Sequence, residues 1–173
     1  LLNPISKGGI TVKNRVAMAP MTRSRAIGNL PNKLIATYYA QRNNAGLIIS
    51  EGNAPSPNGI GYARTPGIYS DEQIEAWKNV TKETKQNNTL FFTQLMHVGR
   101  VGHHANMVSG ATLLAPSAIN ANVDMWTDSQ AMQKTELPKE MTNNEIEQTI
   151  HEFVTASQNA KNQVLMELKY MVQ

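Results

Sequence analysis

The chain has 173 residues, of which 40% are hydrophobic and 17% are charged, and its formal net charge is +3. This is enough apolar material for one folded core and too little charge for a solvated disordered chain. The basic residues are scattered and do not alternate with aromatic ones, so the sequence does not predict a nucleic-acid partner.

The absence of cysteine excludes disulfide bonds and thiolate metal sites, and it suits a cytoplasmic location. No apolar run approaches the roughly 18 residues of a membrane span, so we expect no membrane contact. The opening Leu1-Leu2-Asn3-Pro4 lacks the basic and apolar regions of a signal peptide. Because the first residue is not Met, we expect that a few residues precede it.

The first half of the chain predicts a hairpin, two strands and a helix. Residues 5–12 read as a hairpin with a Gly-Gly turn. The apolar run 16–19, stopped by Pro20, predicts a strand buried on both faces. A helix with an apolar stripe should follow and end at Gly46, and residues 47–49 predict a second buried strand.

The second half repeats this alternation. After a loop over residues 53–67, Ser70 and Gln73 form a capping box that should begin a helix. Residues 89–95 predict the third strand, and an irregular stretch over residues 99–138 follows. A second capping box, Thr142 with Glu145, should begin the last helix, whose apolar residues Ile146, Ile150, Phe153 and Val154 share one face.

Strands therefore alternate with helices, and the long insertions come only after strands. This order predicts a parallel sheet with right-handed crossovers, in the α/β class. Binding sites in such folds are built at the carboxyl ends of the strands, where these long loops begin.

Two segments at predicted strand ends carry groups that could bind a ligand. In Ala19-Pro20-Met21-Thr22, the proline frees the backbone beyond it from the ladder, and Thr22 adds a hydroxyl that could donate to a ring carbonyl. Gln94 is an amide on an apolar strand, and its donors and acceptor would complement a flavin pyrimidine edge. The alternatives are a plain strand end with a threonine cap, and a glutamine bonded to neighbouring strand ends.

The histidines do not predict a metal site. His97, His103 and His104 lack the i, i+4 spacing of a helical zinc site, and no carboxylate follows them until Asp124. We expect them to be surface or capping residues, and His151 to be a partly exposed helix residue. No metal ligands are assigned.

Several segments, read in order, resemble the old yellow enzyme family, FMN-dependent reductases on a (β/α)8 barrel. The resemblance covers about residues 1–162 and is nearest to the alkene, N-ethylmaleimide and nitrate-ester reductases. The segments that carry it are residues 14–23, 38–42, 45–52, 61–67, 77–78, 94–100 and 115–118.

The resemblance implies a truncated (β/α)8 barrel, with an N-terminal hairpin and about three βα units in residues 1–162. It implies FMN as cofactor and NAD(P)H as reductant, with hydride passing from reduced flavin to activated alkenes or to nitro and nitrate-ester compounds. It further implies that FMN is held by Ala19, Pro20, Met21, Thr22, Gly52 and Gln94, and that Tyr62 and Met96 line the substrate side.

The tail, residues 163–173, departs from the family. There the family would read approximately AGFDGVEIHGA, whereas this chain reads QVLMELKYMVQ. An AT-rich coding sequence for the expected peptide, read one base later, gives the whole observed tail. We therefore expect an aberrant tail produced by a reading-frame shift near Asn162, the rival hypothesis being a genuine helical extension.

The chain would then lack the family's proton donor and substrate-binding histidine pair, so no catalytic residue is assigned. We expect an ene-reductase segment with weak or no flavin retention and no turnover, whose open barrel edges favour self-association. The alternatives are a half-barrel that works by complementation or self-association, and a non-catalytic binding module.

Overall fold

The structure, a computed structural model, describes residues 1–163 and 167–172. The α-helices are α1 (Lys33–Ala40), α2 (Asp71–Thr84) and α3 (Asn143–Gln158). The strands are β1 (Ile5–Lys7), β2 (Ile10–Val12), β3 (Ala17–Met18), β4 (Leu47–Asn53), β5 (Leu90–His97), β6 (Leu114–Ala115), β7 (Asp124–Thr127), β8 (Ala131–Lys134), β9 (Lys139–Glu140) and β10 (Glu167–Val172).

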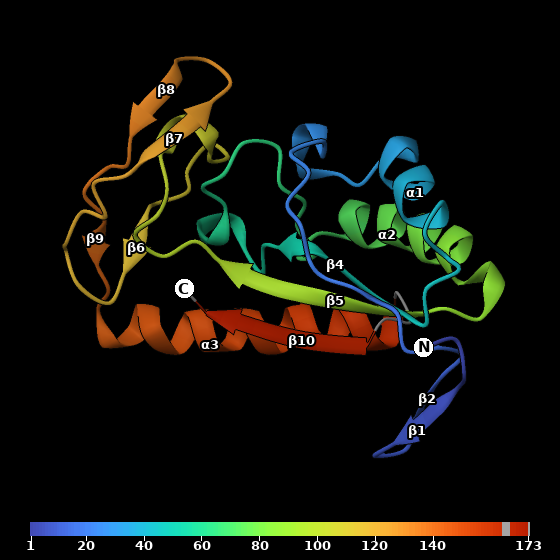
Figure 1. Cartoon of the computed structure of the whole chain (residues 1–173). Helices are drawn as coiled ribbons and strands as arrows, with labels where there is room; N and C mark the ends of the chain where they lie inside the picture. Colours follow the sequence, from blue (N-terminus) through green and yellow to red (C-terminus); the bar gives the residue numbers. More distant parts are fainter. Residues whose placement is uncertain (164–166, 173) are drawn as a thin grey trace.

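A four-stranded parallel sheet with the order β10-β5-β4-β3 organises the chain (Figure 1). Its strands lie side by side in the order in which the chain forms them, and an α-helix lies between each consecutive pair in the sequence. The predicted α/β class and the alternation of strands and helices are confirmed. The predicted hairpin is also present as β1 and β2, and it projects from the end of the sheet opposite the strand tips (Figure 1).

The fourth strand comes from the tail. Residues 167–172 pair in parallel with β5, from Glu167 opposite Phe92 to Val172 opposite His97. The hypothesis of a helical extension is therefore wrong for these residues, because their backbone completes hydrogen bonds that β5 would otherwise leave open. The part of the predicted tail that falls on residues 164–166 and 173 lies outside the described residues.

The first parallel strand is less buried than its sequence predicted. Only Ala17 and Met18 join the ladder, and Val16 is 40% exposed. The prediction of burial on both faces is wrong, because Ala17 is exposed and Met18 is only half-buried in this short edge strand. An apolar run of this kind is typical of a strand in a sheet whose two faces are both covered.

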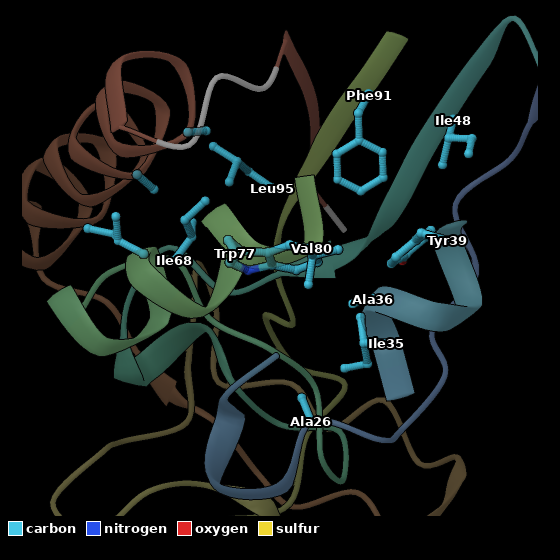
Figure 2. Packing of buried hydrophobic residues seen from close by; sticks show 13 residues of the cluster. Ala26, Ile35, Ala36, Tyr39, Ile48, Ile68, Trp77, Val80, Phe91 and Leu95 are labelled. Carbon is cyan, nitrogen blue, oxygen red and sulfur yellow. The ribbon is translucent and has the colours of Figure 1, made fainter. Parts of the chain in front are cut away.

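The main core fills the space between the sheet and helices α1 and α2 (Figure 2). Tyr39 of α1, Trp77 of α2 and Phe91 of β5 are almost fully buried, with ring centroids 5.1 to 6.4 Å apart. The indole N–H of Trp77 donates to the carbonyl oxygen of Gly67 at 3.2 Å, so its polar atom is satisfied. Burying each such ring contributes on the order of 2 kcal/mol or more.

Both predicted capping boxes are confirmed. Ser70 accepts from the amide of Gln73 and begins α2, while Thr142 accepts from the amide of Glu145 and begins α3. In each box the side chain at the third helical position returns a bond to the capping residue's amide. Two of the amides left open at each helix start are thus satisfied.

The stretch over residues 99–138 is more ordered than predicted. It contains the antiparallel hairpin β7–β8 and the strand β6, which pairs with β9 just beyond the stretch. These short strands gather at the carboxyl end of the sheet (Figure 1). Within the described part of the chain, the helices are too short or too polar to cross a membrane.

Candidate functional site

The site begins with a bulge in β4. Ile49 lies opposite Phe92 and Gly52 lies opposite Gln94, so Ser50 and Glu51 together oppose the single residue between those partners. Such a bulge inserts one extra residue and re-aims the side chains that follow. It turns Gly52 to the same face of the sheet as Gln94.

Gly52, Gln94 and Met96 share this face, on the side of the sheet away from α1 and α2. Phe91 and Leu95 of the same strand belong to the helix-side core, and side chains alternate along a strand, so Gln94 and Met96 point the other way. A Cβ atom on Gly52 would lie 2.8 Å from Met96 Cε and 2.9 Å from its Sδ. Only glycine allows the Met96 side chain to pack this close to the β4 backbone.

Tyr62 joins the same region from the loop after β4. It is half-buried and packs against a small cluster formed by Met96, Val98 and Leu113. Burial raises the pKa of the Tyr62 hydroxyl above its ordinary value. The two residues predicted to line the substrate side, Tyr62 and Met96, therefore lie in one cluster.

The segment Ala19-Pro20-Met21-Thr22 leaves β3 beyond its last ladder pair, Met18 opposite Ile48. The next residue, Arg23, donates its backbone N–H to Glu51 Oε2 at 3.0 Å. Because Glu51 immediately precedes Gly52, this bond holds the segment beside the bulge. Met21 is 44% exposed and Thr22 is also exposed, so both side chains are open to a ligand.

Glu51 was not singled out by the sequence, yet it is the buried carboxyl of this region. It is fully buried, and its Oε1 makes no hydrogen bond within the described residues. Burial raises the pKa of Glu51 to about 7, against the lowering effect of the Arg23 amide and charge. An acidic residue directly after an apolar strand run was the signal that could have revealed it.

A buried polar network supports the bulge from the helix side. Asn53 Nδ2 donates to Ser50 Oγ at 3.0 Å and to Thr93 Oγ1 at 2.9 Å. It also donates to the backbone carbonyl oxygen of Glu51 at 2.8 Å. These bonds pin both bulge residues to β5, so Gly52 and Gln94 are held in fixed register.

The residues at this edge fit a flat heterocycle with a polar margin. Gly52 contributes no side chain and has Met96 packed against it, the neighbouring Gln94 is only 4% exposed, and the Thr22 side chain is exposed. An amide supplies both donors and an acceptor, as the alternating edge of a flavin pyrimidine requires. The donor set is therefore suited to FMN.

The histidines behave as capping residues, as predicted, with one difference. His97 Nδ1 accepts from the amide of Gly99, and His103 Nδ1 accepts from that of Ala105. Burial lowers the pKa of His97, which favours the neutral form of the ring. No carboxylate follows His103 and His104 in the sequence until Asp124, but the fold brings the more distant Glu136 to both of them.

Comparison with known proteins agrees with this architecture. The model of the NADH:flavin oxidoreductase / NADH oxidase family matches residues 1–164. The chain is 37% identical over 163 residues to 12-oxophytodienoate reductase 7 of Oryza sativa subsp. japonica, covering 92% of this chain and 41% of that relative. It therefore spans less than half the length of that relative.

Solved structures give the same result. An old yellow enzyme homologue from Zymomonas mobilis superposes with a TM-score of 0.91 at 36% identity, over 98% of this chain and 47% of that one. Morphinone reductase in complex with tetrahydroNAD superposes with a TM-score of 0.89 at 35% identity, over 98% of this chain and 48% of that one.

The parallel strands, the intervening helices and the polar groups at the strand tips define a partial (β/α)8 barrel of the oxidoreductase class. The chain belongs to the NADH:flavin oxidoreductase / NADH oxidase family, the old yellow enzyme family, and corresponds to the N-terminal part of its members.

Proposed function

We propose that this chain supplies the flavin-ring half of an FMN-dependent ene-reductase site. In this proposal NAD(P)H is the reductant, and the substrates are small electrophiles such as activated alkenes or nitro and nitrate-ester compounds. Bound FMN would supply the hydride. A cytoplasmic location is part of the proposal and is supported by the absence of cysteine.

The chain's own residues would hold and orient the ring. Gln94 would bind the polar edge of the pyrimidine through its amide, and Gly52 would let the backbone approach the ring face. The freed backbone at Ala19, Pro20 and Met21 would flank the ring, and the Thr22 hydroxyl would donate to a ring carbonyl. Tyr62 and Met96 would exclude water from the substrate side.

The observation that carries this proposal is the close grouping of these residues. Gly52 and Gln94 are paired across β4 and β5, and Met96 lies so close to Gly52 that a Cβ atom there would be 2.8 Å from Met96 Cε. The bond from the Arg23 amide to Glu51 joins the Thr22 segment to the same bulge. Residues far apart in sequence thus meet at one edge of the sheet.

FMN binding by the purified chain tests the proposal. FMN binding by this chain is expected to be weak, and the dissociation constant obtained from quenching of FMN fluorescence should rise about tenfold in Gln94→Ala, the equivalent of about 1.4 kcal/mol. Gln130→Ala, which removes an exposed amide from the β7–β8 turn, is the matched control and should leave binding unchanged. Equal quenching by Gln94→Ala and the unaltered chain would contradict the assignment of Gln94.

If the chain alone does not retain FMN, residues 1–162 can replace the matching part of morphinone reductase, whose structure they resemble. The chimera should be yellow and should reduce a cyclic enone with NAD(P)H. Loss of FMN from the chimera on Thr22→Ala or Gln94→Ala supports the proposal, whereas a colourless chimera that is folded by circular dichroism contradicts it.

A second candidate, a half-barrel that acts through self-association, is favoured by exposed apolar residues between β3 and β4 and on α3. Ile27 and Leu34, in the segment that joins β3 to β4, are 75% and 61% exposed, and Ile150 of α3 is 60% exposed. Exposed apolar residues that gather on a surface are typical of sites where another protein surface packs.

We also propose that residues 163–173 arise from a reading-frame shift near Asn162. The match between the observed tail and the shifted reading of the expected peptide supports this. Sequencing the gene tests it: an open frame that continues in register with the tail, with no family-like sequence in another frame, would refute the shift.

A further inference from the structure

A group of three metal-ligating side chains lies outside the flavin region. Among the described residues, His103, His104 and Glu136 each offer a ligand atom, and these atoms lie within 4.8 Å of one another. Both imidazoles approach the same carboxylate oxygen, Glu136 Oε1, with His103 Nε2 3.9 Å from it and His104 Nδ1 in hydrogen-bond contact. The two rings are stacked, with centroids 4.7 Å apart.

The backbone fixes the carboxylate against the histidines. The Glu136 amide donates to the carbonyl oxygen of Gly102 at 3.2 Å, and the His104 amide donates to Glu136 Oε2 at 2.6 Å. The second oxygen is therefore held in place while Oε1 faces the rings. Hydrogen-bonded carboxylates of this kind are the ones that serve well as metal ligands, because their orientation is set beforehand.

We propose that His103, His104 and Glu136 form a binding site for a zinc-like divalent cation. The ion would take His103 Nε2, His104 Nδ1 and Glu136 Oε1 as ligands, with water in the fourth position. Two imidazole nitrogens and one carboxylate oxygen suit Zn²⁺, whereas Mg²⁺ and Ca²⁺ need oxygen ligands.

Only a small adjustment is needed to close the site. Ligand atoms about 2.1 Å from a tetrahedral ion lie roughly 3.4 Å apart, so His103 Nε2 has to approach Glu136 Oε1 by about half an ångström, whereas His104 Nδ1, now in hydrogen-bond contact with that oxygen, has to move away from it. The His104 side chain is 68% exposed and can turn, whereas that of His103 is 7% exposed and is held by its surroundings. One contact opposes the site: the Ala105 amide donates to His103 Nδ1, which would carry the proton once Nε2 ligates an ion.

Occupation would stiffen the loop over the candidate substrate side. Gly102, next to His103, packs against Gly61, and Asn106 Nδ2 donates to the Gly61 carbonyl oxygen at 3.1 Å. Gly61 directly precedes Tyr62. An ion bound by His103, His104 and Glu136 would therefore restrict the motion of residues 102–106, which contact Gly61 beside Tyr62.

Titration of the tag-free chain with Zn²⁺ in a calorimeter tests the proposal. We expect one ion per chain with a dissociation constant in the micromolar range, because two contacts must be broken: the Ala105 amide bond to His103 Nδ1 and the hydrogen bond between His104 Nδ1 and Glu136 Oε1. His104→Ala and Glu136→Gln should each weaken binding tenfold or more. His151→Ala, an exposed histidine on α3, is the matched control and should bind as the unaltered chain does.

Co²⁺ provides an independent readout, since a tetrahedral site gives visible absorption bands that loosely held ions do not. Circular dichroism establishes whether each variant is folded. If His104→Ala does not fold, the test rests on Glu136→Gln, which retains the shape of the side chain. Absence of one-to-one binding in the unaltered chain, or equal binding by Glu136→Gln, would overturn the proposal.

Discussion

Glu51 links protonation to stability at the scale of a single residue. Its carboxyl is fully buried, and burial raises its pKa from the ordinary 4.5 to about 7. The folded chain therefore holds a proton that the unfolded chain releases between about pH 4.5 and pH 7. Folding stability should fall as the pH rises through this window and be level above it.

Glu51→Gln tests this dependence. Its amide oxygen can still accept from the Arg23 amide, but the side chain no longer ionises. Between pH 5 and pH 8 the unfolding free energy of the unaltered chain should fall relative to that of Glu51→Gln by roughly 2 to 3 kcal/mol, most of what the pKa difference is worth. Urea denaturation at both pH values measures it.

The comparison with Glu51→Gln removes contributions from other groups. His97 has the opposite effect on folding stability. Because burial lowers its pKa, the unfolded chain takes up a proton at this residue more readily than the folded chain, so its contribution to stability decreases as the pH falls. It is present in both proteins and cancels in the difference. Parallel stability profiles for the two proteins would show that Glu51 does not titrate as described.

The residues that sequence reasoning missed owe their roles to distant neighbours. Glu136 lies 32 positions from His104, and only the return of the chain after β8 brings them together. In contrast, Gln94 was found because a local pattern, an amide on an apolar strand, carries information by itself, whereas Gly52 was assigned only through the family resemblance. Their assignment to FMN stays a prediction.

The helix starts give a prediction at the scale of elements. Ser70 accepts from the Gln73 amide at 3.3 Å, and its own amide donates to Gln73 Oε1 at 3.2 Å. Ser70→Ala removes the side-chain acceptor and should lower the unfolding free energy by about 1 kcal/mol. Ser109→Ala, at an exposed loop position, is the control and should change it by less than about 0.5 kcal/mol.

Thermal or urea denaturation followed by circular dichroism measures both variants. A loss in Ser70→Ala no larger than in Ser109→Ala would mean that α2 is held by packing alone. Trp77, Ile74 and Val80 do anchor this helix to the core, so the cap and the packing can be separated only by such a measurement.

Elements whose signals are local were predicted well. The capping boxes, the hairpin and the parallel strands each follow from a few adjacent residues. The predicted burial of β3 was wrong because burial of a strand depends on what packs against its two faces, which the residues of the strand do not encode; Ala17 is exposed and Met18 is half-buried. The strands inside residues 99–138 were missed because short pairings such as Leu114 with Lys139 are set by the fold around them.

The distribution of apolar surface gives a prediction for the whole molecule. A cavity of about 280 Å³ beside α3 is lined mainly by apolar side chains, among them Leu114, Met141, Ile150 and Phe153. Exposed Ile27 and Leu34 belong to a different part of the chain, the segment that follows the edge strand β3. Apolar surface in both places favours association between copies of the chain.

Light scattering during size exclusion should therefore report masses above the 19.1 kDa of one chain. The double variant Leu34→Gln with Ile150→Gln should shift the distribution toward the single chain, because it removes apolar area in both places. Glu147→Gln, an exposed change on α3, should have no such effect. A single-chain mass for the unaltered protein at high concentration would contradict the expectation.

The extra residue in β4 implies that the same strand has a competing alignment. If β4 continued past Ile49 as a regular ladder, Glu51 instead of Gly52 would stand opposite Gln94. A carboxyl side chain would then collide with Met96, which packs directly against the glycine. The bonds that Asn53 makes to Ser50 and to the Glu51 carbonyl oppose this slip, because they keep both residues on the far side of the sheet. The Asn53 amide therefore helps to hold the register in which Gly52, and not Glu51, stands opposite Gln94.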